Sequence, residues 1–189
     1  MEYIIIGIIA GYLIGSIPFG FILLKLAGLG DVRKIGSGTV GATNVMRLGG
    51  FKFALATFIL DFLKAFIPAY FLGPWAGIAA VVGHNYSIYL GMKSSGKGFS
   101  ASGGVLTAIA PIMLLPCFAI WLVIALATGY SSLAAIVLLI ITPPFGFLIS
   151  NQVGAALVTL GVIGLFVYRN NIKRLLNGTE PKIQWRKPK

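Results

Sequence analysis

The sequence predicts an all-α integral membrane protein, a compact bundle of about seven transmembrane helices. Of its 189 residues, 58% are hydrophobic and only 10% are charged, whereas soluble domains carry about 25% charged residues. Apolar runs long enough to cross a bilayer recur along the chain, and ionisable side chains are costly where hydrocarbon surrounds them. A soluble globular domain is therefore excluded.

The few charges are strongly biased, since 15 Lys and Arg face 4 Asp and Glu and give a formal net charge of +11. Basic residues gather in two loops, 28–52 and 91–99, and in a tail, 169–189. The positive-inside rule puts all three on the cytoplasmic side. This arrangement requires an odd number of crossings with the N-terminus outside. So little exposed polar length favours anionic lipid or phosphate as partners over nucleic acid.

A single polytopic domain, 1–189, is expected. The predicted spans are 3–27, 53–72, 75–90, 100–110, 111–128, 131–149 and 152–168. The first has no basic residue before it, so we expect a permanent span and not a signal peptide. It carries Gly7, Gly11 and Gly15, whose spacing predicts close packing against a neighbouring helix.

The second span contains Asp61 and Lys64, one helical turn apart. They can form a structural ion pair or serve a neighbouring polar site. Beyond residue 100 the chain is divided by its helix breakers, notably Pro111 and Gly129. These 69 residues must cross an even number of times, so five spans in total are the alternative to seven.

Several kinds of chemistry are excluded by residue count. Cys117 is the only cysteine and His84 the only histidine, and the carboxylates are Glu2, Asp31, Asp61 and Glu180. A metal cage or a carboxylate dyad is hard to assemble from these residues, so no metal and no cofactor are expected. Catalysis must depend mainly on cations, hydroxyls, amides and backbone groups.

The first loop contains a literal G-x-G-x-x-G at residues 36–41. It is not a dinucleotide site, because the glycines join membrane helices and no βαβ unit precedes them. Glycines here allow backbone N–H groups to face an oxyanion, and Arg47 offers a bidentate fork for phosphate. A flexible turn that carries a positive-inside arginine is the alternative.

The second loop, 91–98, nearly satisfies G-x-x-x-x-G-K-[ST], but Gly98 occupies the Ser/Thr position and no strand precedes it. A nucleotide P-loop is therefore not expected, although Lys97 between two glycines suits a phosphate. His84, before this loop, is either a packed histidine or a catalytic one. No aspartate follows it within several residues, so the H-x4-D acyltransferase pair is absent.

The tail segment 169–180 places Ile172, Leu175 and Leu176 on one helical face beside cations, as in an amphipathic helix that binds anionic lipid. Together the blocks GSGTVGATNVMR (36–47), GHNYSIYLGMKSSGKG (83–98) and NIKRLLNGTE (171–180) resemble the bacterial acyl-phosphate:glycerol-3-phosphate acyltransferase family. The resemblance covers essentially the full length. It departs at Thr39, where the family usually has Asn, at the longer 94–96 segment, and at Tyr168, where a His is common.

The resemblance implies transfer of a fatty acyl group from acyl phosphate to the 1-hydroxyl of glycerol 3-phosphate. The products are lysophosphatidate and phosphate, in the first step of bacterial phospholipid synthesis. It also implies a multi-pass protein of the bacterial inner membrane with its active site at the cytoplasmic face. Membrane lipids are expected as partners, no obligate protein partner is evident, and a monomer is plausible. A transporter of a small phosphorylated or anionic solute is the alternative.

Candidate catalytic residues are Ser37, Arg47, Lys97, His84 and Asn171. Candidate substrate- or phosphate-binding residues are Gly36, Gly38, Thr39, Gly41, Thr43, Asn44, Gly96, Gly98, Arg174, Gly178 and Glu180. No protein base or nucleophile stands out. We therefore expect direct attack by the substrate hydroxyl, with a substrate phosphate as the proton acceptor.

Overall fold

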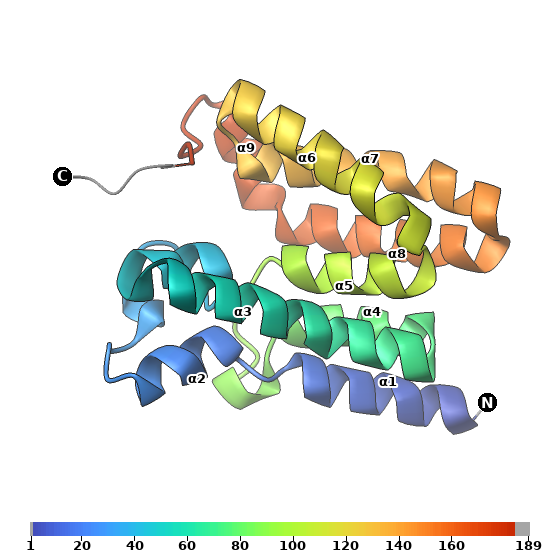
Figure 1. Ribbon diagram of the computed structural model, residues 1–189, viewed down its shortest axis with the longest axis horizontal. Helices are drawn as coiled ribbons and strands as arrows, with labels where there is room; N and C mark the ends of the chain where they lie inside the picture. Colours follow the sequence, from blue (N-terminus) through green and yellow to red (C-terminus); the bar gives the residue numbers. More distant parts are fainter. Residues whose placement is uncertain (1, 184–189) are drawn as a thin grey trace. The chain divides into compact units, whose positions relative to one another are not determined.

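A computed structural model describes residues 2–183, and their regular secondary structure is entirely helical (Figure 1). The α-helices are α1 (Glu2–Gly15), α2 (Phe19–Leu26), α3 (Ala42–Leu72), α4 (Pro74–Asn85), α5 (Phe99–Ile109), α6 (Leu114–Thr128), α7 (Ser131–Ile149), α8 (Asn151–Val167) and α9 (Arg169–Leu176). Short 3₁₀ turns lie at Val32–Lys34, Ile88–Leu90 and Pro111–Met113. The chain divides after Ile109 into two compact units, which are described separately.

In unit 1, α1 packs along α4, and α3 packs against α4 and α5. The α1 contact uses the predicted glycines, since a Cβ at Gly11 or Gly15 would overlap the backbone of Ala76 or Ala80 in α4. The opposite side of α1 exposes isoleucines, among them Ile4 and Ile6. Buried glycine with exposed isoleucine is the pattern of a helix surrounded by lipid.

Several helix boundaries differ from the sequence prediction. The predicted span 75–90 ends as an α-helix at Asn85, and a separate 3₁₀ turn follows it. The first predicted span is broken at residues 16–18, because Pro18 has no N–H and disfavours helical backbone in the residue before it. The predicted 28–52 loop is helical from Ala42 onward. Gly50, with φ 76° and ψ −172°, separates this first piece of α3 from the membrane helix that follows. Such a backbone conformation favours glycine.

In unit 2, α7 packs against α6 and α8, and α9 contacts both α7 and α8. Ala135, Ile136 and Tyr168 form a buried cluster that Ile172 and Leu175 of α9 complete. The chain bends by 60° between α8 and α9. The apolar face that the sequence predicted for the tail helix is therefore used, at least in part, to pack on its own unit.

Four helical segments of residues 2–183 are long and apolar enough to cross a membrane: Glu2–Leu26, Ala42–Leu72, Pro111–Thr128 and Ser131–Ile149. The bent α8 and α9 pair would make a fifth. Helices α4 and α5 have 12 and 11 residues, short of the roughly 20 needed for a full crossing. The all-helical membrane class is confirmed. The seven-span topology with the N-terminus outside stays a prediction.

Candidate functional site

Asn44 organises the first loop. Its side chain is buried, and its amide nitrogen donates to the carbonyl oxygens of Val32, Ile35 and Thr39 at 2.9, 3.2 and 2.8 Å. Its amide oxygen accepts from the Ser37 backbone N–H at 3.3 Å. Helix α3 thus holds the loop that precedes it through one side chain. The amide of this predicted binding residue is engaged within the protein.

Gly36 and Gly38 have φ of 52° and 69°, so both turns of this loop use left-handed backbone. A Cβ on Gly36 would overlap the Arg47 guanidinium and the Asn44 amide. Arg47 Nη1 donates to Asn44 Oδ1 at 3.4 Å. Glycine at position 36 therefore lets the arginine lie directly against the loop backbone, as the proposed phosphate fork requires.

The hydroxyls of the first loop lie at its surface. Ser37 Oγ and Thr39 Oγ1 are 2.8 Å apart and hydrogen-bonded to each other. Gly41 caps the N-terminus of α3, and Thr43 is exposed in its first turn. Ser37, Thr43 and Arg47 are thus exposed at the surface of unit 1.

The second loop is joined to the first by a backbone hydrogen bond and is fixed to the end of α4 by others. The Val40 N–H donates to the Ser95 carbonyl, and the Ser95 N–H donates to the Asn85 carbonyl, both at 2.8 Å. Ser95 Oγ donates to the His84 carbonyl at 2.6 Å. Gly98 has φ 72° and lies against the Asn85 side chain. The structure therefore brings together the first two sequence blocks, as predicted.

A cavity of about 190 Å³ lies where these loops meet. Its lining residues are Arg33, Gly38, Val40, Leu90, Lys93, Ser94 and Ser95. From sequence, Arg33 and Lys93 contribute only to the basic loops that indicate topology, and neither is among the predicted site residues. Their position in basic cytoplasmic loops was the available signal, but it could not show which cations share a cavity.

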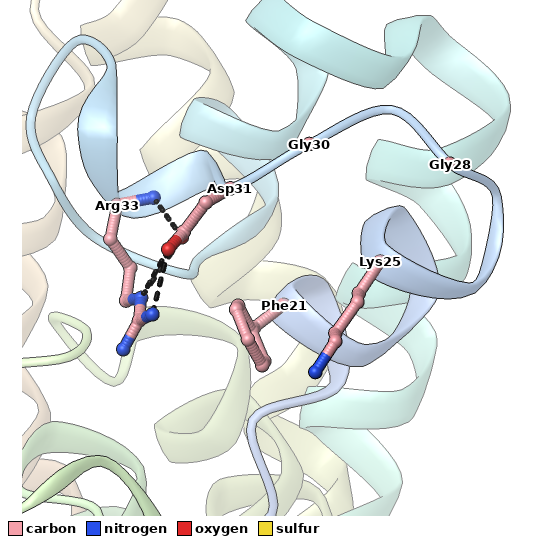
Figure 2. Close-up of a pocket in the computed structure, with 6 residues that line it drawn as sticks. All are labelled: Phe21, Lys25, Gly28, Gly30, Asp31 and Arg33. Carbon is pink, nitrogen blue, oxygen red and sulfur yellow. Dashed lines mark hydrogen bonds and ion pairs between the residues drawn. The ribbon is translucent and has the colours of Figure 1, made fainter.

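A second cavity, of about 450 Å³, lies between the end of α2 and the 28–33 segment (Figure 2). The guanidinium of Arg33 lies 4.6 Å from the centroid of the Phe21 ring, and Lys25 Nζ lies 5.6 Å from it. Arg33 also forms a paired contact with Asp31 at 2.7 to 3.1 Å. This contact lowers the pKa of Asp31 to about 2 and raises that of Arg33. Arg33 lines both cavities.

His84 lies in the interior of unit 1, where 4% of its surface is exposed. Its Nδ1 is 3.5 Å from Asp61 Oδ1, and the same oxygen pairs with Lys64 Nζ at 2.7 Å. The Asp61–Lys64 pair is thus present, as one of the two sequence interpretations predicted. The approach of Asp61 to His84 was not predicted, because the two residues lie on different helices, 23 positions apart.

In unit 2 the tail block is organised by Glu180, whose side chain is 5% exposed. Asn171 and Ser132 donate to its Oε1 at 2.6 and 2.7 Å, and Arg174 donates to Oε2 at 2.7 Å. Burial tends to raise the pKa of Glu180, but these three hydrogen bonds outweigh it and lower the pKa. Gly178, with φ 67°, provides the turn after α9 that returns Glu180 to the helix.

No group of three or more His, Cys, Asp or Glu side chains in residues 2–183 is arranged to hold a metal ion. Lys97 is partly buried in the second loop, beside Gly96 and Gly98. The groups of unit 1 that could contact a ligand are therefore loop backbone, hydroxyls and cations, namely Arg33, Arg47, Lys93 and Lys97. In unit 2 the corresponding groups are the amide of Asn171 and the guanidinium of Arg174, both bonded to the Glu180 carboxylate.

Known proteins match nearly the whole chain. The family described as Glycerol-3-phosphate acyltransferase matches residues 5–178. A Rhizobium etli protein of that name is 47% identical over 184 residues, which cover 93% of this chain and 89% of the relative. An Agrobacterium fabrum protein of the same name is 48% identical over 182 residues, with 92% and 88% covered.

Solved structures agree with these matches. The crystal structure of PlsY (YgiH), an integral membrane glycerol 3-phosphate acyltransferase, has a TM-score of 0.88 and 38% identity in its glycerol 3-phosphate form, with 96% of each chain covered. Its lysophosphatidic acid form has a TM-score of 0.87 and 37% identity, with 96% of this chain and 95% of that chain covered. These matches favour the enzyme over the transporter. This chain is an integral membrane enzyme that belongs to the glycerol-3-phosphate acyltransferase family.

Proposed function

We propose that this enzyme transfers a fatty acyl group from acyl phosphate to the 1-hydroxyl of glycerol 3-phosphate. The substrate hydroxyl oxygen attacks the acyl carbonyl carbon, and the bond between that carbon and the bridging phosphate oxygen breaks. The hydroxyl proton passes to phosphate, so lysophosphatidate and inorganic phosphate leave. Solved relatives in glycerol 3-phosphate and lysophosphatidic acid forms support the acceptor and the product.

The observation that carries the proposal is the junction of the two glycine loops through Val40 and Ser95. The cavity at this junction is lined by two cations, Arg33 and Lys93, and by the backbone of Gly38, which suits the binding of phosphate. We assign phosphate and oxyanion contacts to Ser37, Thr39, the Gly38–Gly41 backbone, Arg47 and Lys97. From the family resemblance we also assign substrate contacts to Asn171 and Arg174 of the tail.

The geometry refines some of these roles. Asn44 acts by fixing the first loop, because its amide is bonded within that loop. Glu180 acts by holding Asn171 and Arg174, since a carboxylate repels phosphate and its own oxygens already accept three hydrogen bonds. Gly36, Gly96, Gly98 and Gly178 provide backbone shape, and Thr43 contributes a hydroxyl at the start of α3. No metal or cofactor takes part in the proposed reaction.

Residues 2–183 present no exposed histidine–carboxylate pair, which suits an acyl phosphate because a mixed anhydride already has a good leaving group. A thioester such as acyl-CoA would be expected to need a positioned base. The test compares palmitoyl phosphate with palmitoyl-CoA at saturating glycerol 3-phosphate, with purified protein in detergent. We expect turnover with the phosphate donor alone. Comparable rates with acyl-CoA would contradict the donor assignment.

We further propose that both loops and the tail face the cytoplasm in the bacterial inner membrane, with an N-terminus outside and a monomeric enzyme. The positive-inside count supports this orientation. Cysteines introduced at Ser94 and Thr179 in a Cys117→Ala background should react with an impermeant reagent from the same side. Reaction from opposite sides would rule out a single site that includes both blocks.

A further inference from the structure

Asp61, Lys64 and His84 form a buried polar cluster inside unit 1. Their exposed fractions are 1%, 4% and 4%. Charges within an apolar helical bundle are costly, and replacing a buried ion pair with apolar residues is often neutral or stabilising. Stability alone therefore does not explain why these groups are here.

The contacts of the cluster form a chain from the Ile17 carbonyl through Lys64 and Asp61 to His84. Lys64 Nζ donates to the Ile17 carbonyl at 2.7 Å, at the break between α1 and α2. The same nitrogen is 2.7 Å from Asp61 Oδ1, which in turn lies 3.5 Å from His84 Nδ1. Asp61 is thus fixed by Lys64 on one side and faces the imidazole on the other.

The far edge of the imidazole supports the second loop. A Cβ on Gly96 would overlap His84 Nε2, so the ring lies directly against the Gly96 backbone. The neighbouring Ser95 is bonded to the His84 carbonyl through its hydroxyl and to Val40 of the first loop through its own carbonyl. Lys97 follows immediately. Any rotation of the imidazole would therefore displace the loop that carries the proposed phosphate ligand.

A carboxylate facing one nitrogen of a histidine fixes both the tautomer and the orientation of the ring. The 3.5 Å approach of Asp61 Oδ1 to Nδ1 is an electrostatic contact and not a hydrogen bond, and the negative charge favours a proton on Nδ1. The Nε2 edge of the ring then faces the loop. Gly96 lies against the Nε2 edge, so the ring is placed to support the loop.

We propose that Asp61 is a positioning residue, which acts through His84 to set the Gly96–Lys97 segment at the phosphate site. The inference rests on the proposed function, because that function gives Lys97 its role. Lys64 neutralises Asp61 and ties it to the Ile17 carbonyl. Asp61 itself touches no substrate.

The test separates positioning from simple charge pairing. Asp61→Asn leaves Lys64 as an unpaired buried cation, and it should lower thermal stability as well as activity. The double variant Asp61→Asn/Lys64→Gln removes both charges. If the pair is only structural, the double variant regains both melting temperature and kinetics. If Asp61 positions the loop, melting temperature recovers while the KM for the phosphorylated substrates stays about 10- to 100-fold raised.

His84→Asn provides a second route, because it keeps the ion pair and removes the link to Gly96. It should reproduce the raised KM even where the double variant does not fold. Combining all three substitutions should add little to either effect, since they break one chain of contacts. Glu2→Gln is the matched control, an exposed carboxylate in the first turn of α1. We expect its KM, kcat and melting temperature to match those of the wild type.

Two results would overturn the positioning role of Asp61. They are a wild-type KM in folded His84→Asn and full kinetic recovery in the double variant. Glycerol 3-phosphate affinity, measured by calorimetry without a donor, gives a second readout and should fall in the same variants. If the wild type used a donor other than acyl phosphate, the proposed function would fail. The Asp61 comparison could still be made with that donor and by calorimetry.

Discussion

The glycine loops of unit 1 and the tail of unit 2 both carry cations proposed to meet phosphate, but they hold them differently. In the loops Arg47 bonds to the neutral amide of Asn44 and lies against Gly36. In the tail Arg174 bonds to the carboxylate of Glu180. An arginine held by an amide keeps its full charge for a ligand, whereas one held by a carboxylate is largely neutralised. The comparison assigns charge stabilisation to the loops and positioning to the tail.

The largest effect should follow removal of a loop cation. Arg47→Ala and Lys97→Ala should each lower kcat/KM by about 100-fold or more, because a desolvated phosphate is left without its partner. Steady-state phosphate release measures this effect. Both variants should remain folded by size-exclusion chromatography in detergent, and Cys117→Ala should be nearly silent. Wild-type turnover in either cation variant would remove that residue from the site.

The second prediction compares one glycine from each region. Gly96→Ala places a methyl group against the His84 imidazole, whereas Gly178 has open space around it and only an unfavourable φ of 67°. We expect Gly96→Ala to lower kcat/KM by about tenfold or more, and Gly178→Ala to cost about 1–2 kcal/mol of local stability with a smaller kinetic effect. An equal loss of kcat/KM in Gly96→Ala and Gly178→Ala would contradict the different roles assigned to the loops and the tail.

Much of this organisation was predictable from sequence, and the reason differs from one part to another. The glycine spacing of the first helix and the one-turn spacing of Asp61 and Lys64 are local patterns, and both appear as predicted. The roles of Asn44, Ser95 and Glu180 depend on partners in other segments, which no spacing rule provides. The helical start of α3 is not evident from sequence, because the segment before residue 52 is polar and basic and therefore predicts a loop. In the structure Gly50 instead breaks the helix at one point.

The third prediction concerns the hydrogen bonds that Glu180 accepts from Ser132, Asn171 and Arg174. Glu180→Gln keeps the shape but weakens three charge-assisted hydrogen bonds, and it should reduce kcat/KM several-fold without abolishing activity. Because the folded pKa of Glu180 is lowered, its contribution to stability is present above its ordinary pKa of 4.5 and is lost as pH falls through the lower, folded value. Limited proteolysis of the tail across this acidic range should show release in the wild type, and little pH dependence in the variant. If Glu180→Gln lost activity as completely as Arg47→Ala, the tail would take a direct part in catalysis.

The smallest effect is expected at Asp31 in unit 1, where a carboxylate holds a cavity-lining arginine as Glu180 holds Arg174 in unit 2. The pair is partly exposed, with 43% of the Arg33 side chain and 22% of the Asp31 side chain accessible, so it adds little to stability. Asp31→Asn releases the Arg33 guanidinium towards both cavities that it lines. We therefore expect the KM for glycerol 3-phosphate to fall by at most about twofold, with an unchanged melting temperature. Because the pKa of Asp31 is about 2, the wild-type carboxylate stays ionised at every pH where the enzyme is assayed, and the effect should not vary with pH. A raised KM in Asp31→Asn would show instead that the carboxylate orients Arg33 for the ligand, and the loops would then share the positioning device of the tail.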